Sequence, residues 1–369
     1  MTKMNSVKST GLCVLMFWTV TSGLSRTDDD IIRRQGFVSA LPVYQTWTIK
    51  DGDRYSEFSS PVMLYVPLSR VSSVMLRGAR ANTGGDARSL SGFTDAQLGL
   101  TYHLEKYNVV FSLNVNVPSG INEFDQDEFG TSLVISNTLF NFQVPNFGQG
   151  FNVTPGFVWA IPVSNTLVLG LGASYQYRGS FKPLAELDDY DPGDEILLTG
   201  GFDVRMGETS TLSVDMIFTS YGRDKLGGDV VFGSGSKIVA NVQFRKDLNL
   251  NELRVLARYR TLSKSDIAYG GILVPEQDKV APNQFELLAS YRARLRETLF
   301  INFLAEARFF EESPDLFSSV SLFAVGIAPE FSLSSDLTLP ARLKLQAGSL
   351  KGGRSVLGVE LGAGLRLSF

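Results

Sequence analysis

The sequence has very few of the residues that build disulfides and metal centres. Among its 369 residues there is one cysteine, Cys13, and one histidine, His103. A single cysteine cannot form a disulfide within the chain, and one cysteine with one histidine cannot make a metal cluster. We therefore expect no metal site, and we predict no cofactor.

Long apolar runs and an excess of positive charge are also missing. After residue 30 no stretch of about 18 residues is uninterruptedly apolar, which excludes ordinary membrane-spanning helices there. The net charge is −4, which argues against a nucleic-acid partner. Any membrane-spanning part of this chain must therefore cross with strands, since only helices and closed barrels span lipid.

The N-terminus has the composition of a secretory signal peptide. Two lysines precede an apolar segment, 11–20, that is too short to span a membrane, and small residues follow it. An uncleaved anchor helix is the alternative. We predict a signal peptide at 1–25, a periplasmic N-terminal arm at 26–35 and a single folded domain at 36–369.

Strict alternation of apolar and polar residues is the main pattern of that domain, and it is clearest at the C-terminus. Polar residues and glycines occupy the even positions of 357–369, and the odd positions are apolar: Leu357, Val359, Leu361, Ala363, Leu365, Leu367 and Phe369. A period of two is that of a β-strand with one apolar and one polar face. Similar segments recur from residue 36 onward, for example at 107–117, 167–178 and 299–310.

Short and long connections alternate between these segments, as periplasmic turns and extracellular loops do in a barrel. A soluble sandwich is the alternative. Its polar faces favour Lys, Glu and Thr, whereas here they are rich in Gly, Ser, Asn and Arg. We predict an all-β fold, a transmembrane antiparallel up-and-down β-barrel of about sixteen strands. Fourteen strands is the alternative, because Pro42 and Pro61 weaken the first segments.

The last strand resembles the closing strand of bacterial outer-membrane β-barrels, which ends in Phe. The resemblance implies localisation in the bacterial outer membrane and contact with outer-membrane lipid. It also implies that the barrel assembly machinery recognises a C-terminal signal at Leu365, Leu367 and Phe369.

Enzymes with a barrel fold need a histidine in a defined setting. A barrel phospholipase or deacylase carries a His-x-Ser pattern, but Leu104 and Glu105 follow His103. A barrel protease needs a histidine at the extracellular rim, and His103 is expected near a periplasmic turn. We therefore predict no catalytic residues and no enzyme activity.

Charged and apolar residues on the inward faces and in one long loop form the candidate site. The loop, 118–150, has an acidic first part, Glu123, Asp125, Asp127 and Glu128, and an apolar part, Leu133, Ile135, Leu139, Phe140 and Phe142. Such an apolar segment is expected to fold into the lumen or pack under other loops. The inward parity of the later strands is basic and predicts a positive pore lining: Arg254, Arg258, Arg260, Arg292, Arg294, Arg308, Arg342 and Lys344. Alternatively, these residues pair with Glu286, Glu306 and Glu360 and fill the lumen.

The position and length of the loop resemble the third loop of general porins, which folds inward and narrows the channel. In those porins loop carboxylates face wall arginines, and the field between them orients polar solutes. The resemblance implies that the acidic part of the loop faces Arg258, Arg292, Arg308 and Arg342, and that the protein is a homotrimer. General porins carry their arginines on early strands, whereas here they are late.

A second resemblance is to outer-membrane proteins of aromatic-compound degradation operons, which are related in outline to long-chain fatty acid transporters. It rests on Asn-Phe-Gly-Gln-Gly-Phe-Asn at 146–152 and Tyr-Gln-Tyr-Arg at 175–178. We predict an outer-membrane channel for passive diffusion of small solutes, narrowed by loop 118–150. The alternatives are an outer-membrane transporter of hydrophobic or aromatic small molecules with an apolar loop pocket, and a non-conducting adhesin or scaffold barrel.

Overall fold

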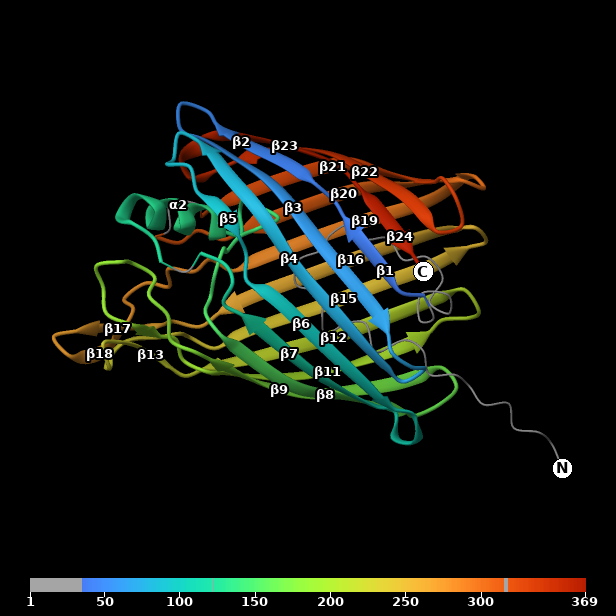
Figure 1. Cartoon of the computed structure of the whole chain (residues 1–369), viewed down its shortest axis with the longest axis horizontal. Coiled ribbons are helices and arrows are strands. Elements are labelled where there is room, and N and C mark those ends of the chain that lie inside the picture. The colour runs from blue at the N-terminus through green and yellow to red at the C-terminus, as the bar shows by residue number, and fades with distance from the viewer. Residues whose placement is uncertain (1–34, 122, 315–317) are drawn as a thin grey trace.

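Sixteen antiparallel strands close into a barrel in the computed structural model, which describes residues 35–121, 123–314 and 318–369 (Figure 1). The predicted signal peptide, 1–25, and all but the last residue of the arm, 26–35, lie outside these residues. The hydrogen-bonded sheet has nineteen segments. It makes sixteen strands because β1–β2 and β23–β24 are interrupted strands and β5 is a short extension beside β4.

The segments of the barrel wall have the following bounds: β1 Phe37–Ala40, β2 Val43–Ile49, β3 Arg54–Pro67, β4 Ser72–Gly85, β5 Ser91–Phe93, β6 Ala96–Leu104, β7 Val109–Val117, β8 Asn152–Pro162, β9 Leu167–Arg178, β11 Glu195–Arg205, β12 Ser210–Tyr221, β15 Lys237–Leu248, β16 Asn251–Leu262, β19 Gln284–Arg296, β20 Leu299–Phe310, β21 Val320–Ser332, β22 Leu337–Ser349, β23 Ser355–Ala363 and β24 Leu365–Ser368. Each strand pairs with its neighbours in sequence, as an up-and-down barrel requires.

The first and last strands join to close the barrel. β1 pairs with β24 and β2 pairs with β23, both antiparallel. Beyond β24, the N–H groups of Gly36 and Phe369 donate to each other's carbonyl oxygens over 2.9 Å each. The prediction of sixteen strands is confirmed, and the fourteen-strand alternative is wrong.

The two early prolines have different effects on their strands. Pro42 lies at the interruption between β1 and β2, where Ala363 N donates to its carbonyl over 3.2 Å. Pro61 lies inside the continuous strand β3, where its carbonyl accepts from Leu41 N over 3.2 Å. Proline removes one donor only, so the acceptor side of the ladder persists. The expectation that Pro61 weakens its strand is therefore not met.

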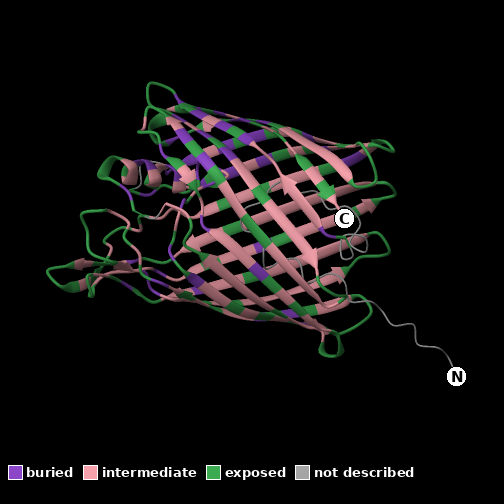
Figure 2. Ribbon diagram, viewed as in Figure 1, coloured by how far each residue is buried: buried purple, intermediate pink, exposed green. Residues whose placement is uncertain are grey.

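Apolar side chains cover the outside of the barrel. Outward residues from strands all round the wall are about half exposed, for example Phe111 at 46%, Leu171 at 50% and Leu357 at 59%. More and less exposed residues alternate along several strands, for example β9 and β21 (Figure 2). An apolar exterior without a strand edge is the surface that lipid solvates. This is a membrane-spanning barrel of the bacterial outer-membrane type.

The two ends of the barrel differ. Short turns such as 105–107 and 163–166 lie at one end, which is the periplasmic end by the usual rule for such barrels. The other end carries helix α2, Gln126–Ser136, and a second sheet of five strands (Figure 1). Its strands are β10 Tyr190–Asp191, β13 Arg223–Leu226, β14 Asp229–Gly233, β17 Asp266–Tyr269 and β18 Ile272–Pro275. No helix in the described part of the chain is long and apolar enough to cross a membrane.

The sequence predicted long polar loops where this second sheet forms. The structure instead extends loops 222–236 and 261–283 as hairpins. Asp224 links them to the loop before β11, because it accepts from Gly193 N over 2.8 Å and from the hydroxyl of Tyr190. Burial and this hydrogen bond raise the pKa of Tyr190, so its phenol stays protonated as the donor.

Replacing Phe369 with alanine is expected to lower the yield of assembled barrel severalfold. Phe369 ends the strand that closes the barrel on Gly36, and its ring is 62% exposed on the lipid side. The fraction of heat-modifiable, folded protein in isolated outer membranes measures the effect. Phe331→Ala is the matched control, because Phe331 is an outward aromatic near the same end of the barrel, 43% exposed. An equal loss in both variants would contradict a special role for the last residue.

Candidate functional site

Loop 118–150 leaves the wall after β7, enters the lumen and returns to β8. Asp95 fixes both ends of the loop. Its carboxylate accepts from Gly120 N over 2.9 Å and from Gln149 N over 2.7 Å. Asn116 donates to the same carboxylate over 2.7 Å. The loop is therefore held at its base by one buried acid.

The acidic part of the loop begins α2. Asp125 caps the helix by accepting from Glu128 N over 2.9 Å, and the Glu128 carboxylate accepts from Asp125 N over 3.1 Å. Arg88, from the preceding extracellular loop, contacts Asp125 at 2.8 Å and Asp127 at 3.2 Å. The porin resemblance had implied that these acids face the wall arginines. The structure places Asp125 and Asp127 against Arg88 instead.

The apolar part of the loop packs against the inner wall. Leu139, Phe140 and Phe142 are at most 1% exposed. The Phe140 ring lies 5.2 Å from the ring of Tyr55 and 5.9 Å from that of Trp47. Ile135 belongs to the same buried cluster, whereas Leu133 is 57% exposed. These side chains fill the space between loop and wall, because the loop has folded into the lumen.

Four wall side chains bind the backbone of the loop. Gln45 and Trp47 donate to the carbonyl of Phe140 over 2.7 and 3.0 Å. Glu57 accepts from Val144 N over 3.1 Å. Arg308 donates to the carbonyls of Thr138 and Leu139 over 3.2 and 2.9 Å. Because each contact is to the backbone, the path of the loop is set independently of most of its side chains.

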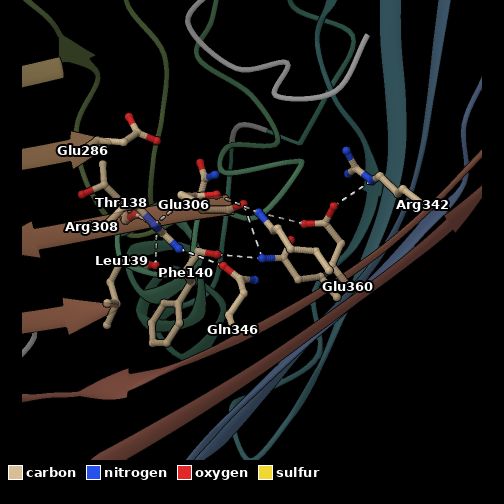
Figure 3. A network of polar contacts seen from close by, with 12 residues as sticks. Thr138, Leu139, Phe140, Glu286, Glu306, Arg308, Arg342, Gln346 and Glu360 are labelled. Atoms are coloured by element: carbon tan, nitrogen blue, oxygen red, sulfur yellow. Dashed lines mark hydrogen bonds and ion pairs between the residues drawn. The ribbon is translucent and has the colours of Figure 1, made fainter. Parts of the chain in front are cut away.

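A chain of buried charges lies beside these contacts (Figure 3). Glu306 contacts Arg308 at 2.7 Å and Lys344 at 3.4 Å. Lys344 reaches Glu360 at 3.6 Å, and Glu360 contacts Arg342 at 2.7 Å. All five side chains are at most 9% exposed. Buried charges need such mutual pairing, so the chain forms one cooperative unit that holds Arg308 on the loop.

The predicted basic residues gather on one wall of a cavity of about 410 Å³. Loop residues 136–146 form another side of it. Seven basic and four acidic residues line it, which leaves an excess of three positive charges: Arg254, Arg258, Arg260, Arg292, Arg308, Arg342 and Lys344 against Glu252, Glu286, Glu306 and Glu360. Arg294 is not among the lining residues, and its guanidinium lies 5.7 Å from the Phe300 ring near the periplasmic end.

Most of these arginines have carboxylate partners from the wall itself. Arg258 contacts Glu286 at 3.3 Å, and Arg292 contacts Glu330 at 3.2 Å. Arg254 pairs with Glu252. The sequence left open whether the basic residues line a pore or pair with wall glutamates. The structure shows such ion pairs beside the cavity.

The wall on the other side of the barrel carries small inward residues. On β8, β9 and β11, Ala160, Gly170 and Gly201 stand in one row across neighbouring strands. Gly156 and Ser174 form a second such pair. These small residues therefore lie on strands other than β2, β3 and β20, on which the loop is anchored.

Sequence reasoning missed the anchors Gln45, Trp47, Glu57 and Asp95. The first three lie on the strands whose pattern was least clear, and nothing local distinguishes a wall residue that binds a loop. The alternation of inward and outward positions identifies Glu57 and Gln45 only as inward polar residues. In the part of the chain that the structure describes, no three His, Cys, Asp or Glu side chains group to hold a metal ion.

No protein-family model and no curated protein sequence matches this chain. Among solved structures it is similar to OccAB1 of Acinetobacter baumannii, with a TM-score of 0.47 and 8% identity over 91% of this chain and 96% of that one. It is similar to OpdQ of Pseudomonas aeruginosa, with a TM-score of 0.46 and 8% identity over 91% and 99%. A triple mutant of the Rhodopseudomonas blastica porin gives a TM-score of 0.36 and 12% identity over 90% and 99%.

Proposed function

We propose that this outer-membrane barrel is a channel for passive diffusion of small solutes, with an arginine-lined lumen narrowed by loop 118–150. The observation that carries the proposal is the 410 Å³ cavity between the basic wall and a loop anchored inside the lumen. A sixteen-stranded barrel encloses more space than wall side chains fill. The loop divides that space in its folded position, so no movement of the loop is needed to narrow the lumen.

The excess of positive charge on the cavity predicts a preference for anions. Charged groups in a narrow, low-dielectric pore attract counter-ions and repel ions of like charge. Arg260 contributes to this field because its contact is with the neutral amide of Gln284, at 3.3 Å. The paired arginines contribute less, since each has a glutamate close by.

Conductance in a planar bilayer tests the proposal. Purified, heat-modifiable protein should give stable current steps that are proportional to voltage. A bilayer that stays silent after insertion of folded protein would refute the channel. Native mass spectrometry of the same sample tests the further proposal of a homotrimer.

Arg260→Glu is expected to reduce anion preference. The change lowers the charge excess of the cavity from three to one, so the reversal potential in a salt gradient should shift toward the cation side. Lys106→Glu is the matched control, because it makes the same charge change on an exposed periplasmic turn. If both variants keep the reversal potential of the wild type, Arg260 does not face the conducting path.

The alternative of a transporter for hydrophobic or aromatic molecules required an apolar pocket in the loop. The loop residues predicted for it, Leu139, Phe140 and Phe142, are packed on the wall, and no observation favours that function over the channel. The loops on the extracellular side carry a small sheet, yet none of its features favours an adhesin over a channel.

A further inference from the structure

A second cavity lies on the other side of the lumen loop. Its volume is about 290 Å³, and the inner wall of β1, β3, β4 and β24 forms one side of it. Loop residues 143–149 form the opposite side. The cavity shares Gln143, Pro145, Asn146 and Arg342 with the larger one, so the two meet at loop residues 143–146.

Two arginines face this cavity from one lateral row of the wall. Arg366 is opposite Ser39, Ser39 is opposite Met63, and Met63 is opposite Arg77. Their Cα atoms are thus three strand spacings apart, about 14 Å. Long side chains on the concave face of a barrel converge, so both guanidiniums can reach one small molecule above Ser39 and Met63.

These two arginines differ from those of the basic wall, because no carboxylate of the described residues forms an ion pair with either. Arg77 donates to the neutral amide of Gln97. Arg366 lies over the Phe37 ring at 4.3 Å, and its Nε is buried without a hydrogen-bond partner. A buried guanidinium donor without an acceptor is costly, and an anion would satisfy it.

The acids that line the same cavity are already engaged. Asp95 accepts three hydrogen bonds at the base of the loop. Glu330 contacts Arg292 at 3.2 Å. Neither forms an ion pair with Arg77 or Arg366, although Glu330 lies close enough to Arg366 for its charge to act on that guanidinium while it contacts Arg292.

The remaining surface of the cavity is largely apolar. Met63 and Pro61 lie on the wall between the arginines, and Val144 and Phe147 lie on the loop above. A cavity with a few convergent polar groups and apolar walls is the usual form of a small-molecule site. A small inorganic anion could contact the arginines but would make no contact with the apolar walls of the cavity.

We propose that this cavity binds a small organic anion, with its carboxylate between the guanidiniums of Arg77 and Arg366 and its apolar body against Met63 and Pro61. The inference deepens the proposed function, because it names the solute class for which the channel has a resting site. It needs only that the solute reaches the lumen.

Calorimetric titration of the purified full-length barrel with benzoate tests the site, with benzyl alcohol as the neutral probe of the same shape. We expect benzoate to bind at least about tenfold more tightly than benzyl alcohol. Arg77→Gln should weaken benzoate about tenfold, which corresponds to about 1.4 kcal/mol. Arg80→Gln is the matched control: it lies on the same strand, stacks on Phe93 at 5.7 Å and does not line the cavity.

Ser39→Glu is a second variant, because it places a carboxylate between the two arginines without removing either. Loss of benzoate binding in this variant, with heat-modifiable mobility retained, supports the site. Equal benzoate affinity in the wild type, Arg77→Gln and Ser39→Glu overturns it, as does equal affinity for the neutral probe. If benzoate binding depends on the arginines but the protein carries no current in a bilayer, the binding site is supported and the channel is refuted. Failure of the site can therefore be distinguished from failure of the channel.

Discussion

Replacing residues 126–144 with a short Gly-Ser linker should raise the single-channel conductance at least about twofold, because conductance grows with the open cross-section of a pore. The segment includes α2 and the aromatic residues that fill the space beside β2 and β3. Its removal widens the region where the two cavities meet. The linker retains the loop base, where Asp95 binds Gly120 and Gln149.

The control for this excision is removal of another extracellular segment. The hairpin of β17 and β18 extends beyond the barrel, away from the lumen (Figure 1). Replacing residues 266–275 with a two-residue turn should leave the conductance of the pore unchanged. If the two deletions give the same current steps as the wild type, the lumen loop does not limit conduction.

Lys344→Met should destabilise the folded barrel by about 3 kcal/mol, the lower end of the range for removing one partner of a buried ion pair. Lys344 lies between Glu306 and Glu360 and is 7% exposed. Both carboxylates keep one arginine, Arg308 and Arg342, which limits the loss. The free energy of unfolding in guanidinium chloride, measured in detergent micelles, gives the effect.

Lys351→Met is the matched control for that measurement. Lys351 also contacts a glutamate, Glu312, at 3.2 Å, but both side chains are well exposed. Exposed pairs contribute little, so we expect a change below about 1 kcal/mol. In the double variant Lys344→Met/Glu306→Gln, further stability should be lost, because Arg308 then has no carboxylate partner among the described residues and remains as an uncompensated buried charge. Equal unfolding midpoints for Lys344→Met and Lys351→Met would contradict the role of the buried chain.

The sequence predicted the wall of the barrel well because lipid imposes a local rule. Each outward residue must be apolar, so the period of two is visible within a single strand such as 357–369. Alternating short and long connections then indicated an even number of strands and the end at which the loops lie. These features do not depend on which strands are neighbours in space.

The loops were predicted less well, because extracellular segments outside the membrane follow no such rule. Helix α2 was missed, although Asp125 and Glu128 have the spacing of a capping box. The hairpins of the second sheet were predicted only as long polar loops. The apolar residues Leu139, Phe140 and Phe142 did indicate that this part of the loop leaves water, and they pack in a buried cluster with Trp47 and Tyr55 of the wall.

By itself, the sequence determined the fold class, the strands and their lipid-facing residues, because each is fixed by neighbours in the chain. Only the tertiary structure decided which inward residues meet. Closure of the barrel brings Arg366 of the last strand to the side of Ser39, and folding of the loop brings Phe140 to Trp47. The physical reason is that lumen contacts join residues far apart in sequence, and a polar inward face leaves its partners unspecified until the barrel has closed.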